Sequence, residues 1–410
     1  MSLDRSPVPT ADELGLMRGT PPPPERLVTL DNWMRPPYNR WALQHVSAIL
    51  PTAPVRRDGP VWELPRDERD LGGVGFDLDG ERWTVEEMAR ATATDAILVL
   101  REGTVVWERA FNGMDPHARH LCFSVSKSIT ATAAGVLVEE GSLDPSAAVT
   151  AVLPELAGTT WEGATVRHLL DMRAGMRWDE AYAALDGDVA RYRQASGWWP
   201  RSDPDAPVDV YAMLATVEAD RPHGGAFDYR TPLTSMLGWV CERASGERLP
   251  ELVSRVLWQP LGAEHDAAYA VDPHGTAVAG SGFNATLRDL ARFGELWRLG
   301  GERPDGTRIV SEAWIDDTIA GEADSREAFA AQADGPDPDW PNALYRNKWW
   351  VLDPARPLFS AIGIHGQFVT IDRPSGVVVA MFSSRAAADE VDEFRAFMAA
   401  TRALCRDLGE

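Results

Sequence analysis

Hydrophobic positions along the chain predict strands near both ends of the sequence and helices in its middle. Two apolar, β-branched runs at 96–113 flank the dipeptide Glu102-Gly103, a pattern typical of a β-hairpin. The amphipathic stretch 392–409 predicts a closing helix. Three further apolar runs near the C-terminus predict strands, and they span 347–353, 359–372 and 376–384. Both ends of the chain are therefore expected to contribute to one sheet.

Helix signals dominate the middle of the chain. In one segment Thr231 stands at the N-cap position, Pro232 at the first helical position and Gly246 at the end. Small and apolar residues after position 124 likewise run to Gly141, a second helix terminator. These signals predict a block of helices between the terminal strands.

The predicted elements divide the chain into three parts. Residues 1–60 are rich in proline, lack a long periodic pattern and are expected to form an arm laid over the body. A sheet domain is expected from 61–145 together with 286–410, and a mainly helical domain from the inserted segment 146–285. The predicted fold class is therefore α+β.

Composition narrows the choice of ligand and location. The chain has 410 residues, of which 44% are hydrophobic and 25% charged, and its formal net charge is −22. This charge repels nucleic acid and anionic membranes, so neither is expected as a partner and a small molecule is favoured. The N-terminus shows no signal-peptide pattern and no apolar run reaches about 20 residues, which predicts a cytoplasmic protein.

Lysine is almost absent from the chain. Of its 40 basic residues only Lys127 and Lys348 are lysines. Arginine keeps its proton near neutral pH, whereas a lysine in a desolvated pocket can lose its proton and act as a base. Lys127 lies three positions after Ser124, at the predicted start of a helix, and is therefore a candidate catalytic residue.

The spacing of Ser124 and Lys127 suits nucleophilic catalysis. Residues three apart on a helix share a face, so the hydroxyl and the amine can reach hydrogen-bond distance. A neutral amine can take the serine proton and so activate the nucleophile. The helix N-terminus disfavours the ammonium form and supports an oxyanion. The alternative is a solvated helix face, against which the apolar segment 129–138 argues.

With this motif, residues 95–145 resemble the penicillin-recognising serine hydrolases, a group that includes class C β-lactamases, DD-peptidases, esterases and 6-aminohexanoate-dimer hydrolases. The resemblance implies a β-lactamase/transpeptidase-like fold, in which helices flank an antiparallel sheet and a mainly helical domain is inserted. It also implies hydrolysis without a metal or organic cofactor, a tyrosine far downstream of the serine, and a late strand with a glycine motif.

Tyr229 fits the tyrosine element. It lies 229 − 124 = 105 residues after Ser124 and directly precedes a predicted helix. The resemblance implies that Tyr229 shuttles a proton between nucleophile and leaving group. The family's Tyr-x-Asn asparagine is replaced by Thr231, which weakens the case for β-lactam recognition. A literal Tyr-x-Asn at 345–347 opens an apolar strand and is interpreted as structural.

The late strand of the family is matched near the C-terminus. An alignment of its Lys-Thr-Gly motif with Ile364-His365-Gly366 implies that the backbone N–H groups of Ser124 and Gln367 form an oxyanion hole. His365 and Gly366 would then border the substrate. A plain edge strand with an internally satisfied histidine is the alternative for His365.

The resemblance is closest to 6-aminohexanoate-dimer hydrolases and their carboxylesterase relatives. The segment 169–182 has their Leu-Leu-x-x-x-x-Gly turn followed by Tyr182, which is expected to close over the bound amide; an ordinary loop aromatic is the alternative. Trp349 and Trp350 are expected beside the site, one in the acyl pocket and one in the core. Acidic residues around Tyr182 could attract a substrate ammonium, although such loops are usually solvated. They are Asp179, Glu180, Asp186 and Asp188.

We therefore expect a serine hydrolase that cleaves ester or amide bonds of small molecules through an acyl-enzyme, resembling 6-aminohexanoate-dimer hydrolase with carboxylesterase activity. A β-lactamase or DD-peptidase-like enzyme and a catalytically inactive ligand-binding relative are the alternatives. A Gly-x-Ser-x-Gly nucleophile elbow is absent from the sequence. His117, His120 and Cys122 lack the spacing of a zinc site, so no metal is expected. The sequence leaves the physiological substrate and the oligomeric state open.

Overall fold

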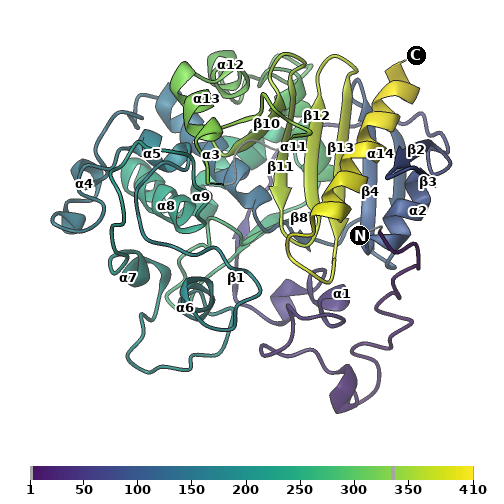
Figure 1. Cartoon of the computed structure of the whole chain (residues 1–410), viewed down its shortest axis with the longest axis horizontal. Coiled ribbons are helices and arrows are strands. Elements are labelled where there is room, and N and C mark those ends of the chain that lie inside the picture. Colours follow the sequence, from purple (N-terminus) through teal and green to yellow (C-terminus); the bar gives the residue numbers. More distant parts are fainter. Residues whose placement is uncertain (1–2, 334–337, 410) are drawn as a thin grey trace.

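A seven-stranded antiparallel sheet forms the centre of the computed structural model, which describes residues 3–333 and 338–409 (Figure 1). Its strand order is β5-β4-β13-β12-β11-β10-β9. The strands are β4 (Thr94–Arg101), β5 (Thr104–Ala110), β9 (Leu344–Arg346), β10 (Trp349–Asp353), β11 (Leu358–Gly363), β12 (Gln367–Asp372) and β13 (Val377–Ser383). Because β13 pairs with β4, the two ends of the chain meet in one sheet, and the predicted α+β fold is confirmed.

Helices cover both faces of this sheet. In Figure 1, α14 (Val391–Gly409) crosses the outer face, next to α2 (Val85–Ala91). On the inner face α11 (Leu287–Arg298) packs against β12 and β13, and α3 (Val125–Glu139) packs against β11. Both faces are therefore buried, which explains why the central strands are almost continuously apolar.

The remaining helices lie largely on the inner side of the sheet, at the left of Figure 1. They are α4 (Val149–Val152), α5 (Val166–Leu170), α6 (Asp188–Ala195), α7 (Val210–Leu214), α8 (Pro232–Ser245), α9 (Leu249–Val253), α10 (Gln259–Leu261), α12 (Glu312–Ala320) and α13 (Ala323–Ala330), with the short turns η3 (Pro154–Leu156) and η4 (Ser254–Trp258). The helix α8 packs directly against α3, so it brings its own N-terminus close to that of α3. None of the described helices combines the length and the apolar character needed to cross a bilayer.

A second, four-stranded sheet joins segments from different parts of the chain, in the order β1-β7-β8-β6. Its strands are β1 (Thr52–Val55), β6 (His120–Leu121), β7 (Ala267–Ala270) and β8 (Phe283–Ala285). Strands β7 and β8 thus connect the segment 146–285 to the arm and to the residues just before Ser124. The three-part division of the chain stays a prediction.

The N-terminal segment lies against the body through buried polar contacts. Its short elements are η1 (Pro24–Arg26), α1 (Asn39–Ala42) and η2 (Val46–Ala48), and the hairpin β2 (Gly75–Leu78) and β3 (Glu81–Thr84) follows it. The fully buried Trp33 indole donates to the carbonyl of Trp198 at 2.9 Å. The Arg40 guanidinium reaches the buried Asp95 carboxylate at 2.9 Å. These contacts connect the arm to both the helical part and the sheet.

The close packing of α11 on the sheet can be tested at Gly294. A Cβ at this position would lie 2.6 Å from a methyl carbon of Val378 and 2.8 Å from one of Val369. We predict that Gly294→Val lowers the free energy of unfolding by about 1–3 kcal/mol, because overpacked cores push side chains off their rotamers. Chemical denaturation measures this change. Gly73→Val is the control, since a Cβ there meets no atom within 4 Å; an equal loss in both variants would contradict the prediction.

Candidate active site

Ser124 lies at the start of α3, where the chain leaves the small sheet. The strand β6 pairs with β8 and fixes the residues just before the serine. Phe123 then takes a left-handed backbone conformation, with φ of 42°, and its ring is held by contacts with Trp198 and His365. This turn is strained for a bulky residue, and strain of this kind is typical of functional sites. Ser124 is 7% exposed.

The amine of Lys127 points at the serine hydroxyl. Its Nζ lies 2.7 Å from Ser124 Oγ, 2.9 Å from the carbonyl oxygen of Gly280 and 3.2 Å from Thr231 Oγ1. A neutral amine has two N–H groups and one lone pair. The carbonyl and the threonine can take the two N–H groups, which leaves the lone pair for the serine proton.

Burial shifts the pKa of this lysine toward neutral pH. Lys127 is 1% exposed, and desolvation lowers the pKa of its amine to about 7. The Glu180 carboxylate acts in the opposite direction and raises the Lys127 pKa. The helix N-terminus adds to the effect of burial, because its partial positive charge disfavours an ammonium.

Thr231 and Glu180 form a second layer behind the lysine. The Thr231 hydroxyl donates a short hydrogen bond to Glu180, so its oxygen can accept from Lys127. The Thr231 backbone N–H donates to the same carboxylate at 2.9 Å. Thr231 precedes α8 as predicted, but its side chain does not cap that helix. The hydroxyl serves the lysine instead, in the position where the resemblance would place an asparagine.

Tyr229 completes the group around Ser124. Burial raises the pKa of the Tyr229 phenol well above its usual range, and a hydrogen bond with the Ser124 side chain acts in the opposite direction. The phenol therefore stays protonated at neutral pH and can donate. Its ring stacks on Trp350 at 5.5 Å and lies 4.9 Å from the Lys127 amine.

Two backbone N–H groups point to an oxyanion hole, but not the pair expected from the sequence. A Cβ on Gly363 would lie 3.1 Å from the backbone nitrogen of Ser124, so Gly363 is where the strand passes the serine. The next residue, Ile364, borders both cavities at the serine. Among the described residues, neither the Ser124 N–H nor the Ile364 N–H has an acceptor. Gln367 instead begins β12 and pairs with Gly363, and its buried side chain donates to the carbonyl of Ser383. The second candidate oxyanion donor is therefore the backbone N–H of Ile364 and not that of Gln367.

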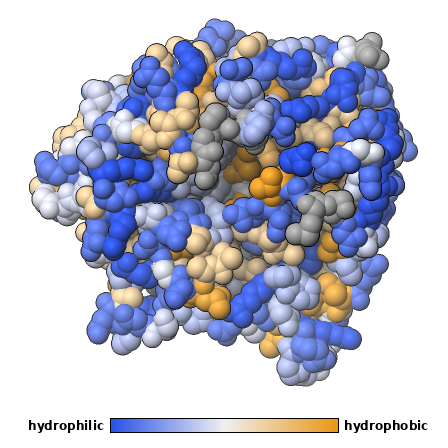
Figure 2. Space-filling model, in the orientation of Figure 1, coloured by the Kyte–Doolittle hydropathy of each residue, from blue (hydrophilic) through white to orange (hydrophobic). Residues whose placement is uncertain are grey.

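Two cavities meet at Ser124. The larger, of about 650 Å³, opens on the face shown in Figure 2, which is hollowed near its middle with hydrophobic residues on the wall. It is lined by Tyr229, Trp350 and a set of apolar side chains from β10 to β12 and α14. The smaller cavity, of about 40 Å³, is lined by aromatic residues of the helical part and by Met34 of the arm. A carbonyl bound at the serine can therefore extend in two directions.

The other predicted substrate residues divide into two groups. Tyr182, Gly366 and Trp350 line the larger cavity, and the Tyr182 hydroxyl donates to Glu180 at 2.9 Å. Trp349 is fully buried against Trp297 at 4.4 Å, so it is the core tryptophan of the pair and not a substrate residue.

His365 also lies outside both cavities. Its Nδ1 hydrogen-bonds with the backbone of Arg385 at 2.8 Å, and burial lowers its pKa to about 4. The prediction that His365 contacts substrate is therefore wrong, and its alternative, an internally satisfied histidine, fits the structure.

The acidic cluster expected to attract an ammonium group does not assemble. Of its four members only Glu180 reaches a cavity at the serine, while Asp179 and Asp186 are exposed. The literal Tyr-x-Asn tyrosine, Tyr345, is buried and packs edge-on against Tyr229, as a structural residue would.

Several site residues had no distinct signal in the sequence. Tyr192 and Arg193 lie on a polar helix that looks solvent-exposed, yet both are buried and line the small cavity. Lys348, the second lysine, is buried with its amine 3.1 Å from the Met172 sulfur, and burial lowers its pKa far below the usual value. The rarity of lysine in the sequence marks Lys348 as well as Lys127. The position of Lys348 near Lys127 could not be predicted, because it depends on tertiary packing.

One group among the described residues has the composition of a metal site. The ligand atoms of His117, Glu264 and His265 lie within 4.8 Å of one another. They border a hollow separate from the cavities at Ser124, and Arg292 reaches the Glu264 carboxylate at 3.2 Å. His120, considered from the sequence as a zinc ligand together with His117, instead hydrogen-bonds with Asp95 at 3.0 Å. His117, Glu264 and His265 therefore lie apart from the group around Ser124.

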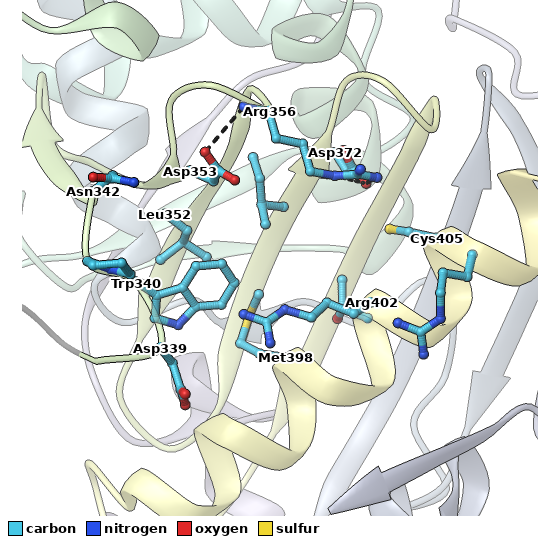
Figure 3. Close-up of a pocket in the computed structure, with 14 residues that line it drawn as sticks. Asp339, Trp340, Asn342, Leu352, Asp353, Arg356, Asp372, Met398, Arg402 and Cys405 are labelled. Carbon is cyan, nitrogen blue, oxygen red and sulfur yellow. Dashed lines mark hydrogen bonds and ion pairs between the residues drawn. The ribbon is translucent and has the colours of Figure 1, made fainter.

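A cavity of about 470 Å³ lies on the outer face of the sheet, beneath α14 (Figure 3). Two of its arginines have partners: Arg356 pairs with Asp372 at 2.6 Å, and the Arg402 guanidinium stacks over the Trp340 ring at 4.1 Å. Cys405 is buried there, and burial raises the pKa of its thiol. Among its described residues, this cavity therefore shows no counterpart of the serine and lysine pair at Ser124.

Known proteins share both sequence and fold with this chain. The family model described as Beta-lactamase matches residues 81–402. The chain is 38% identical to the 6-aminohexanoate-dimer hydrolase of Paenarthrobacter ureafaciens over 356 aligned residues. The aligned region covers 87% of this chain and 88% of that protein. It is also 30% identical over 195 residues to esterase EstB of Burkholderia gladioli, across 44% of this chain and 48% of the esterase.

Solved structures agree with these relatives. A protein from Bacillus anthracis that carries the provisional name 6-aminohexanoate-dimer hydrolase superposes with a TM-score of 0.86 at 27% identity, over 94% of this chain and 98% of that one. A family VIII carboxylesterase shares the fold, with a TM-score of 0.56 at 18% identity over 75% of this chain and 92% of that one. The chain belongs to the beta-lactamase family, as a serine hydrolase that acts on ester or amide bonds.

Proposed function

We propose that Ser124 is the nucleophile, Lys127 its general base and Tyr229 the proton donor to the leaving group. The observation that carries this proposal is the short contact between the buried amine of Lys127 and the Ser124 hydroxyl, at 2.7 Å. Lys127 removes the serine proton as Ser124 Oγ attacks the substrate carbonyl. The oxyanion then forms next to the free N–H groups of Ser124 and Ile364.

The proton balance of the reaction assigns separate tasks to the lysine and the tyrosine. Tyr229 gives its proton to the leaving oxygen or nitrogen, and the ammonium of Lys127 returns a proton to the phenolate. Water then attacks the acyl-enzyme, with the same groups working in reverse. No step requires a cofactor.

We propose small-molecule esters and linear amides as substrates, as in a carboxylesterase related to 6-aminohexanoate-dimer hydrolase. The large apolar cavity suits a hydrophobic leaving group. A β-lactamase or DD-peptidase activity is less well supported, because the hydroxyl of Thr231 is already held between Lys127 and Glu180. The cytoplasmic location and the lack of nucleic-acid and membrane partners stay predictions.

The central test compares four substrates with wild-type protein and Ser124→Ala. We expect p-nitrophenyl acetate and butyrate, or the 6-aminohexanoate linear dimer, to be hydrolysed and nitrocefin to be spared. Ser124→Ala should lose about 10³-fold or more in kcat, as nucleophile removal does in serine hydrolases. A folded wild-type protein that leaves all four substrates intact and fails to react with a fluorophosphonate would instead indicate an inactive ligand-binding relative.

The pH dependence of kcat/KM should report the lysine. Protonated Lys127 cannot accept the serine proton, so activity should fall as pH drops through about 7, the lowered pKa of its amine. Because Glu180 raises this pKa, Glu180→Gln should move the acid limb to lower pH. Stopped-flow ester hydrolysis between pH 5 and 9 measures both profiles. An acid limb that stays in place or moves upward in Glu180→Gln would refute the coupling.

A side chain at Gly363 is expected to lower the catalytic rate. An added Cβ would lie 2.6 Å from the carbonyl oxygen of Cys122 and push β11 away from the serine. We predict that Gly363→Ala lowers kcat by about 10²-fold or more, the cost of losing one oxyanion-hole donor. Gly225→Ala is the control, since its Cβ would have no neighbour nearer than 3.9 Å. Full activity in Gly363→Ala would exclude Ile364 as the second donor.

A further inference from the structure

The two cavities at Ser124 differ in which reaction partner they can hold. Tyr229 lines the large cavity and is not among the residues that line the small one. Because Tyr229 donates to the leaving group in the proposed mechanism, the leaving group occupies the large cavity. The small cavity then receives the acyl chain, on the opposite side of the carbonyl.

Among the residues that the structure describes, two charged side chains line the small cavity, Glu180 and Arg193. The carboxylate of Glu180 is already saturated. It accepts hydrogen bonds from the backbone and the hydroxyl of Thr231, from the Trp178 indole and from the Tyr182 hydroxyl. It therefore has little hydrogen-bonding capacity left for a substrate.

Arg193 is in the opposite situation. It lies on α6, is 8% exposed, and donates one side-chain hydrogen bond, from Nη1 to the carbonyl of Tyr182 at 3.1 Å. Its guanidinium stacks over the ring of Trp199 at 4.8 Å. No ion pair joins it to a carboxylate among the described residues; burial lowers the pKa of its guanidinium to about 10, and the charge of Glu180 only partly opposes this shift. A guanidinium has five N–H donors, so most of its capacity is unused.

We propose that Arg193 is a specificity-determining residue of the acyl subsite, which accepts short acyl chains that end in a carboxylate and rejects chains that end in an ammonium group. The inference rests on the proposed function, since the acyl-enzyme defines which group enters the small cavity. A planar guanidinium binds a carboxylate through paired hydrogen bonds. An ammonium in the same place would meet a like charge in a poorly solvated cavity.

This proposal separates the chain from the activity named for its relative. The acyl half of a 6-aminohexanoate dimer ends in an amine, which is protonated at neutral pH. We therefore expect this chain to use that dimer less well than an uncharged ester with an acyl chain of similar length.

The test uses three benzyl esters that differ only in the group at one end of a short acyl chain. Monobenzyl succinate ends in a carboxylate, benzyl butyrate in a methyl group and benzyl β-alaninate in an ammonium group. Release of benzyl alcohol gives kcat/KM for each. At low salt we expect kcat/KM for the succinate ester to exceed that for the β-alaninate ester by about tenfold or more. The reason is that the guanidinium attracts the carboxylate and repels the ammonium group.

Arg193→Gln should reduce this ratio to about threefold or less, since the amide keeps a donor but removes the charge. Arg191→Gln is the matched control, because Arg191 lies on the same helix with a side chain that is 49% exposed and 3.7 Å from Asp188. An unchanged ratio in Arg193→Gln, or a wild-type preference for the β-alaninate ester, would overturn the proposal. Thermal unfolding of each variant reports whether it folds.

Failure of the proposed function gives a different result. If benzyl butyrate is not hydrolysed by folded wild-type protein, the mechanism at Ser124 fails. Calorimetry still tests the subsite in that case. Binding of succinate but not β-alanine to Ser124→Ala, lost when Arg193→Gln is added, supports the proposal. Equal binding of both ligands, or succinate binding that survives Arg193→Gln, overturns it.

Discussion

The desolvated amine of Lys127 beside the Ser124 hydroxyl is the contact around which this protein is organised. A lysine in water is protonated at neutral pH and cannot activate a serine. Here burial brings the pKa of the amine to about 7, while a carbonyl and a threonine hydroxyl supply its other partners. The Glu180 carboxylate limits that shift from one step further away, through Thr231. The pKa of the proposed base therefore depends on a balance between desolvation and one indirect charge.

Every large part of the fold contributes to this environment. The end of β11 brings Gly363 against the serine backbone, and the next residue, Ile364, borders both cavities. The segment before α8 supplies Tyr229 and Thr231, because α8 packs directly on α3. The arm closes the small cavity with Met34. Residues far apart in the sequence thus bury one amine together.

The local parts of this account could be predicted from the sequence, and the parts set by packing could not. Ser124 and Lys127 are one helical turn apart, so their contact follows from helix geometry alone. The hairpin at Glu102 and Gly103 likewise follows from its turn residues, which have φ values of 49° and 79°. The terminal strands identified the sheet because both its faces are buried.

The errors have one physical origin, since a sequence does not say which face of an element meets the site. Two glycines lie three residues apart in the β11–β12 hairpin, and only packing shows that Gly363, not Gly366, touches the serine. Adjacent strand residues point to opposite faces, so one tryptophan of the pair 349–350 had to be core. Arg193 was missed because a polar helix usually faces water.

The rarity of lysine makes the central claim directly measurable. Selective isotope labelling of lysine side chains gives two sets of NMR signals, and Lys348→Met assigns the one that remains to Lys127. The account predicts that this signal titrates with a midpoint near pH 7, the lowered pKa of the buried amine. A midpoint near 10, as for a solvated lysine, would show that the amine is charged at neutral pH and cannot be the base.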